Sequence, residues 1–211
     1  MAKLARAVMA AASRAASSLN INNHYLLQLL QSEIEYELSK HPSQAPGGLF
    51  GDFVVEWDDP KSEDLLLRRR NGSEEDVAVS SLLGPEGCRG DGTLLDMKAS
   101  MKVCIAKPSL SSVLQFDCSI YGEGDDSSDF SINNVHYLPS VTHMRAEDYK
   151  GPSFSTLDPQ LQEAFKEYLT ARGIDVEFTN FLLLQLRNKE QSQYVNWLQR
   201  IESILKNNTE S

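Results

Sequence analysis

Apolar residues near both ends of the chain recur with the period of an amphipathic helix. Over residues 22–40 they are spaced by three and four positions, as Leu27, Leu30, Ile34 and Leu38. Asp158-Pro159 is an N-cap followed by proline at the first helical position, and Gly173 supplies the stop for that helix. A second helical stretch starts near Val176, and a final run with heptad-like spacing reaches Leu205. The pattern predicts one helix before and two helical blocks after the middle of the chain.

The middle of the chain alternates apolar and polar residues with the period of two that marks half-buried strands. Asn71-Gly72 favours a type I′ hairpin turn, because both central positions of that turn need positive φ. The alternation changes phase between Ile132 and Val135, which indicates a β-bulge. The predicted strands are residues 53–58, 64–70, 77–83, 95–105, 114–120 and 130–137, with a last short strand around Phe154.

These elements predict an α+β domain built on one twisted antiparallel sheet of about seven strands joined by hairpins. An N-terminal helix and two C-terminal helices are expected to flank the sheet. The chain has 211 residues, of which 41% are hydrophobic, enough for one domain with a real core. We place that single domain at residues 21–211. No apolar stretch approaches the length of a membrane-spanning helix.

Residues 1–20 differ in composition from the rest of the chain. They contain Lys3, Arg6 and Arg14 with many alanines and serines, and the first acidic residue is Glu33. This composition is typical of an organelle transit peptide, and mitochondrial and plastid signals share it. A secretory signal is less favoured, because no continuous apolar region follows the basic start. We expect a mitochondrial transit peptide, with a frayed terminus of no function as the alternative.

The chain is acidic, with 20 Lys and Arg against 30 Asp and Glu and a net charge of −10. Removal of the first twenty residues would leave 17 basic residues against 30 acidic ones, a net charge of −13. Such a protein lacks the basic footprint of a nucleic-acid binder and attracts cationic partners. The alternative is that the acids only keep the protein soluble. The predicted client-binding acids lie at strand ends and are Asp58, Asp59, Glu63, Asp64, Glu74, Glu75, Asp76, Glu123, Asp125, Asp126 and Asp129.

No catalytic, cofactor-binding or metal site is predicted. The chain contains no Gly-x-Ser-x-Gly elbow, Walker A loop or His-Glu-x-x-His pair. The acidic loop starting at Asp125 fails as a calcium loop, because its sixth position is Phe130 and its twelfth is His136. Glycines 87, 90 and 92 do not link a strand to a helix, as a dinucleotide-binding loop must.

The remaining reactive side chains are scattered along the sequence. Cys88, Cys104 and Cys118 lack metal-site spacing, and the last two are expected to be unpaired thiols. A metal-binding pair of His136 and His143 is less favoured than histidines at the surface or at strand edges; the other histidines are His24 and His41. The cluster at residues 68–70, three arginines before a hairpin, is expected to balance nearby acids rather than to bind nucleic acid.

Three segments carry a resemblance to a known family. Residues 168–175 read Tyr-Leu-Thr-Ala-Arg-Gly-Ile-Asp, with Phe178 three residues on, and resemble a helix end of the mitochondrial glycoprotein family. Residues 190–206 resemble the closing helix of that family, and residues 130–137 resemble one of its strands, phase change included. The resemblance covers about residues 22–208. It indicates a plant member of these acidic matrix proteins, which are related to the complement component 1q-binding protein.

The resemblance implies a doughnut-shaped homotrimer with asymmetric surface charge and no established catalytic residues. It implies a non-enzymatic, chaperone-like adaptor of the mitochondrial matrix that binds basic proteins, such as mitochondrial ribosomal proteins or assembly factors. Such an adaptor would support organellar gene expression and respiratory-complex biogenesis. The acidic loops are modest here, so no metal role is carried over to them. The alternatives are a metal-dependent or hydrolytic enzyme, and a plastid-targeted member with the same adaptor role.

Overall fold

The computed structural model describes residues 23–40, 49–71, 75–84, 97–122, 128–140, 149 and 151–207. These residues belong to two compact units. The larger unit, residues 46–190, contains the sheet, and the smaller one combines residues 1–45 with residues 191–211. The long helix α3 (Val176–Asn207) contributes its first part to the larger unit and its last part to the smaller one.

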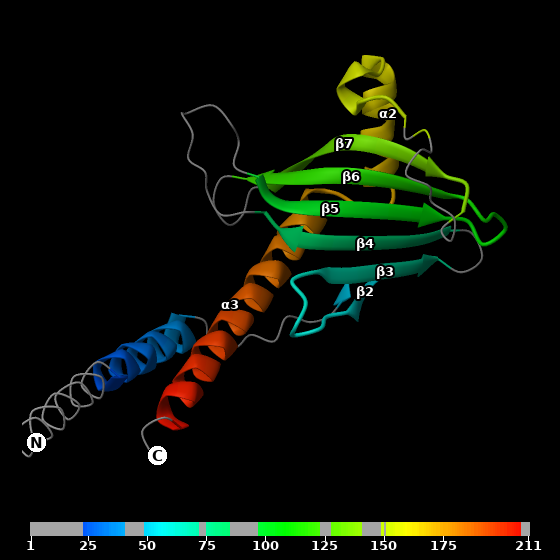
Figure 1. The fold of residues 1–211 in the computed structure, drawn as a ribbon. Helices are drawn as coiled ribbons and strands as arrows, with labels where there is room; N and C mark the ends of the chain where they lie inside the picture. Colours follow the sequence, from blue (N-terminus) through cyan, green and yellow to red (C-terminus); the bar gives the residue numbers. More distant parts are fainter. Residues whose placement is uncertain are drawn as a thin grey trace, which may run out of the picture. The chain divides into compact units, whose positions relative to one another are not determined.

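The larger unit is built on a seven-stranded antiparallel sheet whose strand order follows the sequence order (Figure 1). This confirms the predicted α+β fold and its hairpin connections. The strands are β1 (Leu49–Phe50), β2 (Phe53–Trp57), β3 (Leu65–Asn71), β4 (Glu75–Leu83), β5 (Met97–Ala106), β6 (Val113–Gly122) and β7 (Ser128–Leu138).

The identity of the seventh strand differs from the prediction. The segment around Phe154 is a short 3₁₀ helix, η1 (Phe154–Thr156), and the additional strand is the two-residue β1. The amide of Thr156 and its hydroxyl both donate to the carbonyl of Ser153, at 3.0 and 2.7 Å, which closes a turn instead of an extended segment. Phe154 is buried because its ring packs near that of Phe165, with centroids 6.2 Å apart. The apolar character of Phe154 was therefore not sufficient to predict a strand at this position.

Two irregularities in pairing decide which side chains face the core. In β7, Asn134 pairs with Asp117 and Ile132 pairs with Cys118, so Asn133 is an extra residue and the predicted bulge is confirmed. A second register shift lies in β2 between Val55 and Trp57. Trp57 follows this shift and is 50% exposed.

The turn predicted at Asn71-Gly72 falls mostly outside the described residues. Asn71 belongs to β3 and pairs with Glu75, the first residue of β4. Residues 72–74 are not described, so the type I′ turn stays a prediction.

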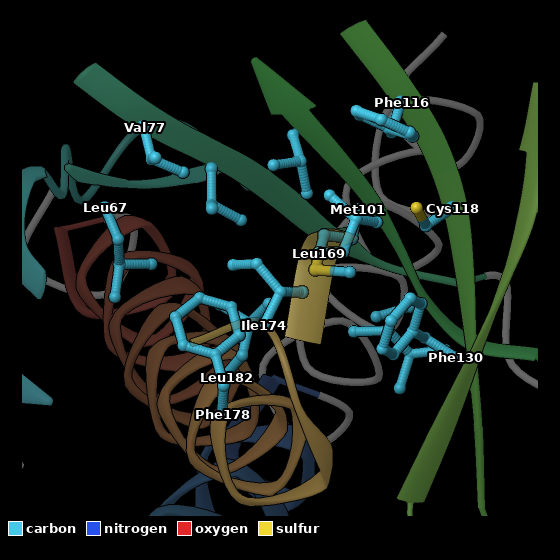
Figure 2. Close-up of a cluster of buried hydrophobic side chains, with 14 of the residues drawn as sticks. Leu67, Val77, Met101, Phe116, Cys118, Phe130, Leu169, Ile174, Phe178 and Leu182 are labelled. Carbon is cyan, nitrogen blue, oxygen red and sulfur yellow. The ribbon is translucent and has the colours of Figure 1, made fainter. Parts of the chain in front are cut away.

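One face of the sheet packs against α2 (Pro159–Thr170) and the first part of α3 (Figure 2). Alternate strand residues such as Leu67, Val77 and Phe116 meet Leu169 and Phe178 from the helical layer, and all five are fully buried. Burying a side chain of this size contributes about 1.5–3 kcal/mol. The predicted start of α2 is confirmed, because the Asp158 side chain caps it and proline follows at the first position.

The smaller unit pairs a helix described over residues 23–40 with the last part of α3. Leu30 and Ile34 are buried against Val195 and Leu198, as the spacing of the first helix predicts. Leu38 was expected on the same face but is 56% exposed. None of the helices that the structure describes combines the length and apolar character needed to span a bilayer.

Candidate functional site

The topology of the sheet separates the predicted acidic residues into two groups. In a meander, successive hairpin connections lie at alternate ends of the strands. The β2–β3 and β6–β7 connections therefore share one end of the sheet, and the β3–β4 connection lies at the other (Figure 1). The first end, called the acidic end below, carries Asp58, Asp59, Glu63, Asp64 and Asp129; Glu75 and Asp76 lie at the opposite end. Glu74, Glu123, Asp125 and Asp126 are outside the described residues.

A lysine from α3 fixes the β2–β3 loop at the acidic end. The Lys189 ammonium donates to the Asp58 carboxylate at 2.6 Å, and to the backbone carbonyls of Asp59 and Asp64 at 3.0 and 2.9 Å. Its side chain is only 6% exposed, and the three bonds use all three of its N–H donors. Lys189 therefore ties the two ends of a seven-residue loop, residues 58–64, to one point on the helix.

Sequence reasoning did not single out Lys189. It lies more than a hundred residues from its partners, and no local motif links them. One signal was present: Lys189 continues the stripe of Phe178, Leu182 and Leu186 at helical spacing. A lysine at a core position must find acceptors, because a buried ammonium without them is strongly destabilising.

The other carboxylates of this loop have no cationic partner among the described residues. Asp59 accepts the backbone N–H of Lys61 at 2.8 Å, and Asp64 accepts the hydroxyl of Ser62. Glu63 is exposed. The loop thus presents three carboxylates whose negative charges are not balanced by a neighbouring side chain.

Asp129 also lies at the acidic end, at the start of β7. It is 64% exposed and pairs with Lys166 of α2 at 3.3 Å. Exposed pairs of this kind contribute about 0–1 kcal/mol, so a competing cation could displace Lys166 at little cost.

The carboxylates at the opposite end form internal ion pairs. Glu75 accepts two hydrogen bonds from the Arg172 guanidinium, each at 2.9 Å. Arg172, together with Lys107 and Arg69, holds the pKa of Glu75 below its usual value. Asp76 pairs with Arg68. Glu75 and Asp76 therefore stabilise the folded structure.

The arginine cluster confirms its expected balancing role at Arg68. This guanidinium bonds Asp76 and also lies 3.3 Å from Glu56, and these acids raise its pKa. Arg69 instead lies against the ring of Phe53, 5.4 Å from its centroid. The side chain of Arg70 is outside the described residues.

The conspicuous segment at residues 168–175 joins α2 to α3. Gly173 has φ of +80°, which ends α2 in a Schellman motif: its own amide donates to Thr170 and that of Ile174 donates to Leu169. Leu169 and Ile174 are both fully buried. Arg172 bonds Glu75, and the following Asp175 caps α3 by accepting the amide of Phe178 at 2.9 Å. Each of these contacts stabilises the helix connection and its packing on the sheet.

The cysteines and histidines that the structure describes do not gather into a reactive group. Cys104 and Cys118 are free thiols, as expected, and burial raises the pKa of both, that of Cys118 to about 12. Both are therefore protonated at neutral pH and poor nucleophiles. His136 bonds Asp117 at 3.0 Å. Among the described residues no three His, Cys, Asp or Glu side chains gather as metal ligands do; Cys88, His41 and His143 are outside them.

Comparison with known families decides the relationship. The sequence profile of the mitochondrial glycoprotein family, MAM33, matches residues 56–205. The chain belongs to this family. The match runs from β2 to the last turns of α3 and covers the three segments on which the resemblance was based, apart from residue 206.

Individual relatives of this mitochondrial glycoprotein family member are distant. The mitochondrial acidic protein mam33 of Schizosaccharomyces pombe is 31% identical over 112 residues, which cover 48% of this chain and 39% of the relative. A mitochondrial protein of Arabidopsis thaliana is 26% identical over 192 residues, covering 85% and 74%. The conserved regulator of innate immunity protein 3 of Caenorhabditis elegans is 26% identical over 198 residues, covering 85% and 82%. The chain therefore spans well under half of the fission yeast relative and most of the other two.

Solved structures support the same fold. The crystal structure of the Trypanosoma brucei p22 protein superposes with a TM-score of 0.67 at 20% identity, covering 88% of this chain and 99% of that one. A Leishmania major protein, described as a sequence homologue of the human p32 protein, gives the same TM-score and identity. The fold of this chain is that of the p32-like proteins.

Proposed function

We propose that the protein is a non-enzymatic adaptor of the mitochondrial matrix that binds basic proteins through the acidic end of its sheet. The observation that carries this proposal is the β2–β3 loop, in which Lys189 fixes the backbone while Asp59, Glu63 and Asp64 have no cationic partner among the described residues. A loop held in this way presents its charges in a defined place, and loops on a rigid scaffold commonly carry binding residues.

The overall charge supports an electrostatic mode of binding. A net charge of −10 attracts Lys- and Arg-rich segments over about a Debye length, roughly 8 Å at physiological salt. Such attraction acts mainly by raising association rates. Glu123, Asp125, Asp126 and Asp129 are expected to add to the β2–β3 loop, because their connection shares its end of the sheet. Glu74, Glu75 and Asp76 are expected to contribute less, because they belong to the opposite end.

Family membership supports the nature of the clients. The net charge of −10 favours basic clients, and the family resemblance implies mitochondrial ribosomal proteins or assembly factors, in support of organellar gene expression and respiratory-complex biogenesis. Proteins that co-purify with this chain from intact organelles at low salt would identify them. A set without basic proteins would argue against the adaptor role.

Removing the three unpaired charges of the β2–β3 loop is expected to weaken binding of a basic client by about tenfold. Each exposed charge pair is worth up to about 1 kcal/mol, so the variant D59N/E63Q/D64N loses several weak attractions at once. Isothermal titration with a purified basic ribosomal protein measures the change. A control with the same net charge, E35Q/E163Q/E167Q, removes three exposed glutamates from helices. Equal losses in both variants would show that only total charge matters and that the loop is no binding site.

We also propose that the chain forms a closed homotrimer, as the family resemblance implies. The helices of the smaller unit leave large apolar side chains in solvent, including Trp197 and Ile204, 56% and 62% exposed. Uncovered apolar surface of this kind often marks an interface, and closed cyclic symmetry is the usual result of self-association. Light scattering should return a stable mass of three chains. A mass of one or two chains would refute the trimer.

Residues 1–20 are proposed to be a mitochondrial transit peptide that is removed on import. The support is their acid-free composition in an otherwise acidic chain. N-terminal sequencing of the endogenous protein should begin near residue 21. A mature protein that retains Met1 or Ala2 would contradict this.

A further inference from the structure

The three consecutive arginines of β3 divide between the two faces of the sheet. Successive strand residues point to opposite faces, so Arg69 lies on the same face as the fully buried Leu67, and Arg68 lies on the other. Arg68 has two acidic partners for its single charge, Asp76 and Glu56. The positive charge of Arg68 is therefore compensated.

The surroundings of Arg69 differ from those of Arg68. Its guanidinium stacks on Phe53, and Nη1 lies 3.6 Å from the position that a Cβ would occupy at Gly173. Its Nε is buried and has no hydrogen-bond partner among the residues that the structure describes. A buried donor without an acceptor is costly, and such groups in native proteins call for an explanation.

Glu75 acts electrostatically with Arg69 and has two further cations around it. Glu75 receives Nε and Nη2 of Arg172 at 2.9 Å, and the Lys107 ammonium lies 3.9 Å from it. All three cations act electrostatically on Glu75. Among the described side chains, this group, called the Arg69 cluster below (Arg69, Glu75, Lys107 and Arg172), holds three positive charges and one negative charge.

An excess of two positive charges is unexpected on a chain with a net charge of −10. Arg172 is held in place: its guanidinium stacks on the Tyr168 ring, with its carbon 3.4 Å from the centroid, and also donates to the Tyr168 carbonyl at 2.9 Å. The Lys107 side chain is 55% exposed and so can reach an ion arriving from solvent. The cluster thus combines two packed guanidinium groups with one exposed ammonium.

We propose that the Arg69 cluster binds a small oxyanion of the phosphate type, either inorganic phosphate or the phosphate group of a small metabolite. A phosphate dianion matches the excess of two charges, and guanidinium groups recognise phosphate oxygens by paired hydrogen bonds. Glu75 keeps Arg172 oriented for this contact. The site is independent of the proposed binding of basic proteins, because it belongs to the opposite end of the sheet from the β2–β3 loop.

Titration of the full-length chain with inorganic phosphate at constant ionic strength tests the proposal. Calorimetry is expected to show saturable binding, and K107Q is expected to weaken it about 2- to 5-fold by removing one exposed charge. K102Q is the matched control. Lys102 is an exposed residue of β5, the strand that ends just before Lys107, and its side chain lies on the other face of the sheet. The K102Q variant should bind phosphate with the same affinity as the wild type.

R69Q should abolish the binding, with far-UV circular dichroism showing that the variant is folded. If R69Q does not fold, the comparison of K107Q with K102Q decides. Glycerol phosphate as a second probe distinguishes a phosphate monoester from the free ion, according to which binds more tightly. Phosphate binding that does not saturate, or equal affinities for K107Q and K102Q, would overturn the proposal.

Discussion

Replacing Lys189 with methionine is expected to lower the free energy of unfolding by about 3 kcal/mol. Methionine keeps the length of the side chain but leaves the Asp58 carboxylate and the carbonyls of Asp59 and Asp64 without their donor. Removing one partner from a buried, hydrogen-bonded charge typically costs about 3–5 kcal/mol, and the partial exposure of Asp58 places the value at the low end.

Urea denaturation at a fixed protein concentration measures this change, because self-association would make the stability depend on concentration. Lys61 lies in the same loop and is exposed, so K61M is the control and should change stability by less than about 0.5 kcal/mol. If K189M were as stable as K61M, Lys189 would not be what fixes the loop. The same variant also bears on binding, because a released loop should hold a basic client less tightly.

Replacing Arg172 with glutamine is expected to cost about 2 kcal/mol. The change removes both hydrogen bonds to Glu75, which then remains half-buried with Lys107 and Arg69 as the other cations that the structure describes around it. Adding E75Q to R172Q should restore part of the loss, because no unpaired carboxylate remains. A double-mutant cycle on the two residues measures their coupling. A coupling near zero would contradict the pairing.

The pH dependence of this pair follows from the direction of the Glu75 shift. Its pKa in the folded protein is depressed, so the stabilising contribution is complete above the ordinary glutamate value of about 4.3. The contribution is lost as the pH falls through the depressed pKa. Wild type and E75Q should therefore differ most in stability at neutral pH and converge in strong acid.

The sequence predicted the sheet well because strand burial follows a strict period of two. The long alternation of β5 places Ala99, Met101, Val103 and Ile105 in the core as expected. The bulge at Asn133 was also visible, because one extra residue shifts the phase of every later side chain. At Trp57 the same kind of shift occurs at the end of a five-residue strand, where too few positions follow to reveal it.

The candidate site was less predictable, because it depends on contacts between distant segments. Composition located the acids at strand ends, but whether an acid is available depends on its partner. Glu75 and Arg172 are 97 residues apart, and Asp58 and Lys189 are 131 apart. The alternation in β4 did not show that Glu75 would meet a guanidinium from a helix end. The sequence of residues 168–175 showed the family resemblance, but the ion pair between Arg172 and Glu75 could be seen only in the folded structure.

The most direct test of the proposed function is the salt dependence of binding to a purified basic ribosomal protein. Affinity is measured for the wild-type chain and for D59N/E63Q/D64N from about 50 to about 300 mM salt. Screening of exposed charges over this range predicts that the wild-type affinity falls steeply, by more than about tenfold, and that the variant starts weaker and falls less. Binding that is insensitive to both salt and substitution would contradict the electrostatic account and indicate an apolar binding surface instead.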